Sequence, residues 1–582
     1  MINMVQNAKD QAAALAMAAY QAAVADGTLP AAEVKTAPVE IPKDTANGDF
    51  TTTFALAASK ALRQAPRNIA QALLDHMDLT GSYFASAEIA GPGFLNFRLN
   101  DSWYAAVCEA VEAEGAVYGT NDGLKGQKIM VEFVSANPTG PMHMGNARGG
   151  VLGDTLASVL TACGADVTRE FYVNDAGHQI DKFAHSIEAR YLQIIQGEEN
   201  VPFPEDGYQG EDIKDLARAY YEENGDKLVS APEQERLDTL AQFGLSVNLP
   251  KMKTDLERYK IHYDNWFYES ALHESGYVKE TVDLLTERGW TYEKDGALWL
   301  RTADILRDHF RKQGKKEADI EKLDLKDDVL RRANGFYTYF AADIAYHRNK
   351  LEVRGFDLAI NIWGADHHGH VARLQAALDG LGLDGSNRLV VVLMQLVNLM
   401  QDGKPVRMSK RSGKAIALHD LLDEISVDAA RYFFNSRAST SPLDFDLDLA
   451  VREDSENPVY YVQYAHARIC SLLSRLGEEG EKVPAAQDVD ASLMTTPEEL
   501  ALMKALAQFP EEIHLAARDY DPSRINRYLV SLAGDFHRFY NSCRIKGEEP
   551  AVLSARLKLA DTVRAVLSNG MGLLGVSAPE KM

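Results

Sequence analysis

The spacing of hydrophobic residues changes along the 582-residue chain and divides it into three regions. In the middle region, short apolar runs with strand character (128–133, 166–173) flank a helix-like run at 147–163. This βαβ alternation predicts a doubly wound parallel sheet in an α/β fold, whose ligands bind beyond the carboxyl ends of the strands. The same pattern returns downstream, in strand-like runs at 295–302, 357–370 and 388–397.

The two flanking regions lack this alternation. Residues 1–125 combine an Ala-rich helical run (11–25), a second helical run (54–74) and a strand at 86–100 that leaves a Gly-Pro-Gly turn, which predicts a small α+β domain. From 454 onward, apolar residues recur at helical spacing, which predicts an all-helical domain. The stripes are more typical of a core than of a binding surface; their residues are Val462, Ala465, Ile469, Leu472, Leu476, Leu553, Leu557, Ala560, Val563 and Leu567.

Residues 190–290 interrupt the middle region. They are charge-rich and mostly helical in pattern, so we expect an insertion into the sheet domain and assign it no chemistry.

Charge and cysteine content narrow the possible settings. A net charge of −24 argues against non-specific nucleic-acid binding but leaves room for a specific RNA partner. The four separated cysteines indicate neither a disulfide framework nor a zinc ribbon, and they fit a reducing, cytoplasmic setting. The run at 11–25 lacks a basic start and is too short and weakly apolar to span a membrane, so we interpret it as a soluble helix.

A Gly/Pro/His turn at 134–150 joins the first strand of the middle region to its helix. The start of a helix offers unpaired N–H groups and a positive dipole end to phosphates. Gly140 and Gly145 permit close approach of a ligand, Pro138 stiffens the turn, and His143 can donate to phosphate oxygens. The alternative is an ordinary βα turn with one solvent-facing histidine.

A basic segment at 401–422 reverses the acidic trend of the chain. Between Gly403 and His419 it carries five basic residues and no acid, which are Lys404, Arg407, Lys410, Arg411 and Lys414. The flanking glycines predict a mobile loop; the alternative is a solvated basic turn.

Together the two motifs resemble a known family. HMGN at 143–146 and RMSKR at 407–411 resemble the HIGH and KMSKS signatures of class I aminoacyl-tRNA synthetases. The stretches VEFVSANPTGPMHMGNARGG, YTYFAADIAYH, GADHHG, VDAARYF and NPVYYVQYAHARI are similar to arginyl-tRNA synthetases, and the resemblance covers nearly the whole chain. It implies a Rossmann-type catalytic domain over 126–453, with a tRNA-elbow-binding domain at 1–125 and an anticodon-binding domain at 454–582.

The resemblance also implies a reaction. Arginine would attack the α-phosphate of ATP, giving an arginyl-adenylate and pyrophosphate, and the terminal ribose of the tRNA would then take the arginyl group. Mg²⁺ would arrive with ATP rather than at a metal site of the protein. A monomer, and a need for bound tRNA before arginine is activated, are further expectations from the family.

Residue roles follow by matching motif positions. The catalytic set is His143, Asn146, Arg407 and Lys410. The remaining expected ATP contacts are Pro138, Thr139, Gly140, Gly145, Gly364, Asp366, Met408 and Ser409. Three positions depart from the family: Asn146 stands where a second histidine is usual, Arg407 where a lysine is usual, and Arg411 where a serine is usual. The amide of Asn146 carries no charge, whereas Arg407 keeps the positive charge, so the division of catalytic roles stays open.

A guanidinium is best matched by planar anions. The resemblance assigns Asp343 and Tyr339 to the guanidinium, and Glu132, Ser135 and Asn137 to the α-amino and carboxylate end or the side chain. His367 is a further expected amino-acid contact. The alternative for Asp343 is a carboxylate on the side of a helix, paired with a nearby base.

Contacts with tRNA are expected at both ends of the chain. Single-stranded bases stack on aromatic side chains, so Tyr460, Tyr461, Tyr540 and the terminal Met582 are anticodon candidates. Asn96, Arg98 and Asn100 are elbow candidates; the alternative there is a packing strand with a solvated polar face.

Three other functions remain open at this point. They are a class I synthetase for another amino acid, a tRNA-binding relative without catalytic activity, and a nucleotidyltransferase with the same turn. The acids Glu132 and Asp343 disfavour the first, His143 and Lys410 the second, and the helical region from 454 the third.

Overall fold

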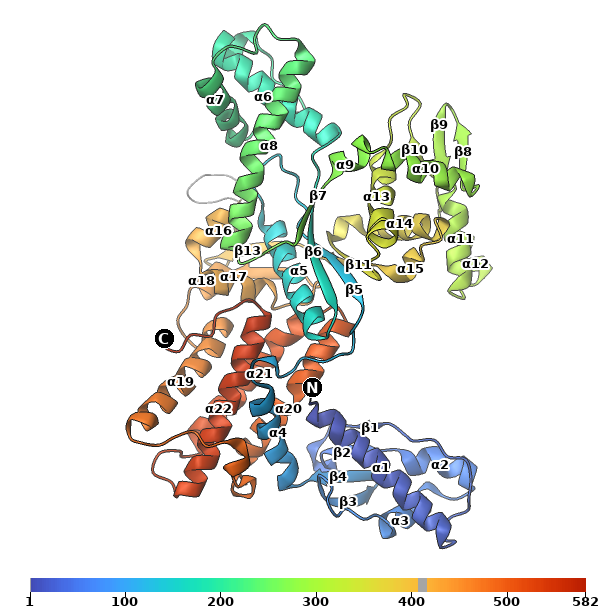
Figure 1. Cartoon of the computed structure of the whole chain (residues 1–582), viewed down its shortest axis with the longest axis vertical. Helices are drawn as coiled ribbons and strands as arrows, with labels where there is room; N and C mark the ends of the chain where they lie inside the picture. The colour runs from blue at the N-terminus through green and yellow to red at the C-terminus, as the bar shows by residue number, and fades with distance from the viewer. Residues whose placement is uncertain (1, 407–415) are drawn as a thin grey trace.

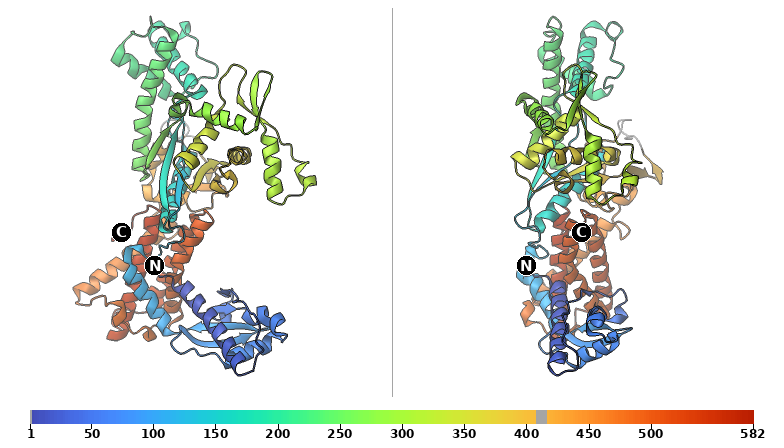
Figure 2. Two further views of the ribbon diagram at one scale, coloured as in Figure 1. Left: turned by 45° about the vertical axis from the view of Figure 1, so that its right-hand side comes forward. Right: turned by 90° about the vertical axis from the view of Figure 1, so that its right-hand side faces the viewer.

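The computed structural model describes residues 2–406 and 416–582 and has an elongated shape, with the N-terminal unit at one end and a helical insertion at the other (Figures 1 and 2). The N-terminal unit is a four-stranded antiparallel sheet of order β1-β2-β4-β3, covered by helices. Its elements are α1 (Met4–Ala25), β1 (Val39–Glu40), β2 (Phe50–Thr52), α2 (Phe54–Leu62), α3 (Pro66–Asp75), β3 (Phe84–Ala90) and β4 (Phe94–Leu99).

The N-terminal unit differs from the sequence prediction in two places. The helical run expected over 54–74 is broken into α2 and α3, because Pro66 starts a new helix at a position where its missing N–H is tolerated. On β4, Asn96 is 3% exposed rather than part of a solvated face, and its Oδ1 accepts a hydrogen bond of 2.7 Å from the Thr51 hydroxyl.

The middle of the molecule is a five-stranded parallel sheet of order β12-β11-β5-β6-β7, as expected for a doubly wound fold. Its strands are β5 (Lys128–Glu132), β6 (Asp166–Val173), β7 (Asn265–Tyr268), β11 (Leu358–Gly364) and β12 (Leu389–Met394). The crossover helix α5 (Met144–Ala162) starts three residues before the predicted run. Its residues are buried on nearly every side, because the sheet, the helical segment at 418–434 and the C-terminal helices all pack against it.

The insertion is shorter than its sequence pattern predicted. Its helices α6 (His178–Gln196), α7 (Glu211–Asn224) and α8 (Glu233–Arg258) form the protruding end of the molecule (Figure 1). The expected span of 190–290 is wrong at its end, because β7 pairs with β6 and belongs to the catalytic sheet. Four residues with three aromatics give too little alternation for this edge strand to be recognised in the sequence.

A second lobe lies beside the sheet (Figure 1), and its elements come between β7 and β12 in the sequence. It contains α9 (Glu269–Glu274), α10 (Tyr277–Glu287), β8 (Thr291–Lys294), β9 (Ala297–Leu300), α11 (Thr302–Lys312), α12 (Glu317–Ile320), β10 (Asp328–Arg331), α13 (Tyr339–Arg348), α14 (His368–Gly380) and α15 (Gly385–Arg388). Helix α13 continues into a π-helical segment, η4 (Asn349–Val353).

The run predicted as one strand over 388–397 is two. β12 ends at Met394, and β13 (Val397–Gln401) joins a separate small sheet with β14 (Lys404–Pro405) and β15 (Leu443–Asp446). Helices α16 (Leu418–Glu424), α17 (Val427–Phe434) and α18 (Leu447–Ala450) complete this part of the fold.

The C-terminal region is a helical bundle of α19 (Pro458–Glu478), α20 (Pro497–Arg518), α21 (Ser523–Ser542) and α22 (Pro550–Leu573). All ten residues of the predicted stripes are buried, so both stripes form core. The connecting helix α4 (Asp101–Glu114) packs on α20 and α22. No helix among residues 2–406 and 416–582 has an apolar stretch long enough to cross a membrane.

Candidate functional site

The HMGN turn is the N-terminal cap of α5. His143 is the N-cap residue: its Nδ1 accepts the Gly145 N–H at 3.1 Å, and the Asn146 side chain accepts the His143 N–H at 3.0 Å. A Cβ at Gly145 would lie 3.0 Å from the His143 ring, so this position favours glycine. Partial burial lowers the pKa of His143, which favours the neutral ring at neutral pH.

Neighbouring elements hold the turn from outside. Asn248 of α8 donates to the Pro138 carbonyl oxygen at 2.9 Å, and Pro138 and Thr139 are both buried. The fully buried guanidinium of Arg148, one turn into α5, donates to the carbonyl oxygens of Gln395, Ala438 and Ser441. The start of α5 is therefore fixed in place before any ligand arrives.

The end of the basic loop lies beside the same turn. The Leu418 N–H donates to the Met142 carbonyl oxygen at 2.9 Å, and His143 forms an isolated β-bridge with Ala417. Arg407, Met408, Ser409 and Lys410 lie outside the described residues. Met142 and Leu418 are more than 250 residues apart in the sequence, and the fold brings them into contact.

Asp343 and Tyr339 lie on the first turns of α13. Oδ2 of Asp343 is 2.9 Å from Nε2 of His370, and the Asp343 side chain remains 35% exposed. The alternative of a carboxylate paired with a nearby base is thus observed in this structure, yet the group stays accessible. The Tyr339 ring lies beside Gly177 at the start of α6, and burial raises the pKa of its hydroxyl.

Tyr172 marks the centre of a carboxylate-rich region. Burial, together with the nearby Glu269 and Asp343 carboxylates, raises its pKa. Glu269 is buried and starts α9, immediately after β7. Glu269 and Asp343 come from two different elements, and they suit a cationic substrate better than an anionic one.

Glu132 and Ser135 adjoin this region, since the Ser135 oxygen accepts the Tyr172 N–H at 3.1 Å. Glu132 is 5% exposed, with Oε1 accepting the Ser135 hydroxyl at 3.0 Å and Oε2 accepting the Lys350 ammonium at 2.5 Å. Asn137 is exposed on the same turn. Direct contact of Glu132 with a substrate remains a prediction, and the structure shows its carboxylate already engaged on both oxygens.

The GADHHG turn follows β11 at the carboxyl edge of the sheet. Gly364 ends the strand, and the Asp366 and His367 side chains are 83% and 57% exposed. The Trp363 ring packs between His367 and His370, with centroids 5.8 and 5.7 Å away. His370 was not among the residues predicted from sequence, although it ends the same histidine-rich motif.

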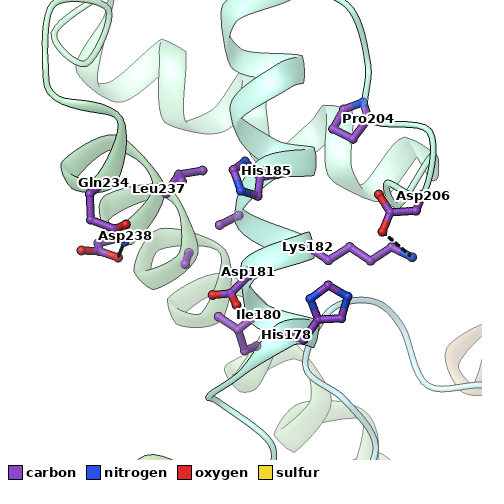
Figure 3. Close-up of a pocket in the computed structure, with 12 residues that line it drawn as sticks. His178, Ile180, Asp181, Lys182, His185, Pro204, Asp206, Gln234, Leu237 and Asp238 are labelled. Carbon is purple, nitrogen blue, oxygen red and sulfur yellow. Dashed lines mark hydrogen bonds and ion pairs between the residues drawn. The ribbon is translucent and has the colours of Figure 1, made fainter. Parts of the chain in front are cut away.

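A groove of about 620 Å³ runs along α6, beginning at His178 (Figure 3). Its charged lining is mixed, since His178, Lys182 and His185 face a groove that also contains Asp181, Asp206 and Asp238. Lys182 and Asp206 approach to 3.9 Å across it. This balance of charge favours no single class of ligand.

The expected elbow contacts have structural partners. Asn96 is buried, and Asn100 caps α4 by accepting the Ser102 and Trp103 N–H groups. Arg98 is exposed and pairs with Glu88 at 3.1 Å. Of the three, Arg98 offers the side chain most accessible to a partner.

The expected anticodon residues belong to a larger aromatic platform on α19 and α21. Tyr460 stacks on Tyr464, and Tyr461 packs on His537. Arg468 covers the rings of Tyr464 and Tyr540, at 4.6 and 5.1 Å from their centroids. Sequence reasoning missed Tyr464 and His537, because a tyrosine-rich helix does not show which rings share a face. Met582 is 53% exposed at the end of the chain.

Matches to known proteins extend over nearly the whole chain. Three family models match it: the arginyl tRNA synthetase N-terminal domain at 12–99, the catalytic domain of class I (R) tRNA synthetases at 110–441, and the DALR anticodon-binding domain at 462–582. Arginine–tRNA ligases of Acetivibrio thermocellus and Caldanaerobacter subterraneus are 50% and 49% identical to it over 582 residues, covering 100% of each chain.

A solved structure supports the fold independently. Arginyl-tRNA synthetase of Thermus thermophilus superposes with a TM-score of 0.72, covering 98% of this chain and 99% of its own at 22% identity.

Proposed function

The chain belongs to the arginyl-tRNA synthetase family and aminoacylates tRNA(Arg), and we propose how its own residues divide this work. Residues 1–125 would bind the tRNA elbow, 126–453 would form the adenylate and transfer arginine, and 454–582 would read the anticodon. The observation that carries the catalytic assignment is the contact between the HMGN turn and the end of the basic loop, at Met142 and Leu418.

ATP is proposed to bind between these two segments. The N–H groups at the start of α5 face developing phosphate charge, with His143 as a hydrogen-bond donor and Lys410 and Arg407 as cations from the loop. Gly140, Gly145 and Thr139 would line the phosphates, and Gly364 and Asp366 the adenosine. Because no covalent intermediate is needed, catalysis rests on positioning and charge stabilisation.

Mg²⁺ is proposed to arrive on the nucleotide's own phosphate oxygens. Over residues 2–406 and 416–582, the group with metal-ligand spacing is His185, Glu188 and Glu233, on α6 and α8 of the insertion. Glu188 there already pairs with Arg236, so this group fits a resident ion poorly.

The guanidinium of arginine is proposed to bind Asp343 and Tyr339, with Asn137 and Ser135 near its α-amino and carboxylate end. His370 now holds the Asp343 carboxylate at 2.9 Å, so substrate binding would replace the His370 ring with the guanidinium as its partner. His367 would contribute from the rim of the site.

The tRNA is proposed to reach both ends of the molecule. Tyr460, Tyr461 and Tyr540 would stack anticodon bases, assisted by Arg468, with Met582 nearby. Arg98, and less directly Asn96 and Asn100, would meet the elbow. We further propose that arginine is activated only when tRNA is bound.

We also propose that the enzyme acts as a cytoplasmic monomer. Its four cysteines are free thiols, as expected in a reducing compartment. Light scattering of the purified chain would test the state; a stable dimer would contradict it.

Pyrophosphate exchange with each amino acid, with and without tRNA, tests the function. Of the amino acids tested, only arginine should support exchange, and it should do so only when tRNA is present. Exchange with another amino acid would favour a different class I specificity. An absence of exchange with intact tRNA binding would favour a relative without catalytic activity.

A further inference from the structure

A buried ion pair lies beneath the proposed arginine site. Lys350 is fully buried and Glu132 is 5% exposed, and the Lys350 Nζ lies 2.5 Å from Oε2 of Glu132. Glu132 is the last residue of β5, whereas Lys350 comes from the π-helical segment η4. π-Helical turns are rare in proteins, and many of those that occur lie at functional sites. Here the π-helical segment carries the buried Lys350.

The ammonium of Lys350 is enclosed by polar and aromatic groups. It donates to Oδ1 of Asn361 at 3.2 Å, lies 3.4 Å from Nε2 of His347, and sits 4.1 Å from the centroid of the Tyr346 ring. With no exposed surface, it cannot touch a substrate. Any effect of Lys350 on arginine must therefore pass through a neighbour.

Glu132 is the neighbour that reaches the site. Its second oxygen accepts the Ser135 hydroxyl, and the Ser135 oxygen in turn accepts the Tyr172 N–H at 3.1 Å. Ser135 and Val134 have φ of 41° and 66°, a region that costs non-glycine residues about 1–3 kcal/mol. The two hydrogen bonds of Ser135 hold this strained turn, which continues directly into Asn137.

We propose that Lys350 is a positioning residue for amino-acid binding: its ion pair holds the Glu132 carboxylate in place, and Glu132 in turn fixes the 134–137 turn against the substrate. This proposal rests on the proposed arginine site. A buried carboxylate without a partner either takes up a proton or shifts towards solvent, and either change would release Ser135.

Lys350 is the counter-ion of Glu132, because the titratable groups around the pair are either neutral or already paired. The other titratable groups facing the pair are Glu170, Arg354, His347, Tyr346, Tyr172 and Tyr263. Glu170 has its own counter-ion, because Arg354 donates to both of its oxygens. Burial lowers the pKa of His347 well below its ordinary value, and burial raises the pKa of the three tyrosines, so these groups stay neutral.

The test is Lys350→Met, measured by arginine-dependent pyrophosphate exchange. The KM for arginine should rise about tenfold or more, while the KM for ATP stays within about twofold. The kcat at saturating arginine should stay within about threefold of wild type, so that the loss appears in the arginine KM. An unchanged arginine KM, or a loss confined to kcat, would overturn the proposal.

Two further variants keep the test decisive if Lys350→Met folds poorly. Glu132→Gln with Lys350→Met removes both charges, and its arginine KM should equal that of Glu132→Gln alone, because Lys350 acts only through Glu132. Additive effects would contradict this. Lys350→Arg keeps the charge and should recover part of the loss.

A matched control comes from the helical bundle. Lys558 is 4% exposed and donates to Glu112 at 2.7 Å, so Lys558→Met removes a similarly buried lysine, from an ion pair far along the chain whose carboxylate is 42% exposed. It should lower the melting temperature without changing the arginine KM. If the wild-type enzyme shows no exchange with arginine, the proposed function and this inference both fail; normal wild-type exchange with an unaffected Lys350→Met overturns the inference alone.

Discussion

The backbone N–H of His143 donates to Oδ1 of Asn146 at 3.0 Å, and this bond explains the asparagine at the end of the HMGN signature. With the Gly145 N–H donating to the His143 ring, it forms a reciprocal capping box at the start of α5. The Asn146 amide therefore orders the helix end that faces the proposed phosphate site. This role requires neither a charge on the side chain nor a proton that it could transfer.

Asn146→Asp should separate the structural role of this residue from its electrostatic role. A carboxylate still accepts the His143 N–H and is favourable at a helix N-terminus, so the melting temperature should hold or rise. The added negative charge would repel the phosphates, and the KM for ATP should rise about tenfold. Asn146→Ala serves as the control, losing about 0.5–1 kcal/mol of helix capping. An unchanged KM for ATP in Asn146→Asp would place this side chain away from the phosphates.

Asp343→Asn should weaken arginine binding in a protein that stays folded. The neutral amide keeps the shape of the side chain but loses the charge that a guanidinium requires, so the KM for arginine should rise about 10–100-fold. Kinetics of pyrophosphate exchange measure this, and thermal melting checks the fold. Normal arginine kinetics in the folded variant would show that Asp343 serves only its partner His370.

How much of the structure could be predicted from the sequence depended on how far apart in the chain the interacting residues lie. Local patterns predicted the limits of β6, the buried stripes of α19 and α22, and the turn before α5, because periodicity and turn chemistry act over a few residues. The pairing of Lys350 with Glu132 joins residues 218 positions apart, and no periodicity encodes it. Likewise, β7 is recognised as part of the sheet only through its pairing with β6.

Lys410→Ala should slow adenylate formation with little change in arginine binding. The expected loss is about 100-fold in kcat, the typical cost of removing one group that stabilises developing charge. Single-turnover formation of the adenylate measures it, with the KM for arginine as the internal control. A variant at full rate would shift this role to Arg407 and Arg411.

His537 should make the stability of the helical bundle depend on pH. Burial and the nearby Arg468 lower its pKa from 6.5 to about 4, so the unfolded chain binds the proton more readily than the folded one. The stabilising effect is then fully present above pH 6.5 and is lost as the pH falls towards 4. Thermal melting of His537→Phe should show a smaller fall over this range than the wild type. Parallel curves would contradict the role of His537.

Gly575→Ala should destabilise the contact between the helical bundle and the catalytic sheet. Arg431 is fully buried there and donates to Asp154 of α5 and to the carbonyl oxygens of Tyr259 and Leu574. A Cβ on Gly575 would lie 2.4 Å from the Arg431 guanidinium, and its φ of +66° is itself unfavourable for alanine. Gly276→Ala is the matched control, with a left-handed φ of +73° and open space around the new methyl group.

The control should lose about 1 kcal/mol from backbone strain alone. Gly575→Ala should lose at least about twice that, because a buried and hydrogen-bonded cation must move to make room. The melting temperatures of the two variants measure the difference. Equal decreases would mean that Arg431 shifts freely, and hence that this junction is loosely packed rather than fixed by the ion pair with Asp154.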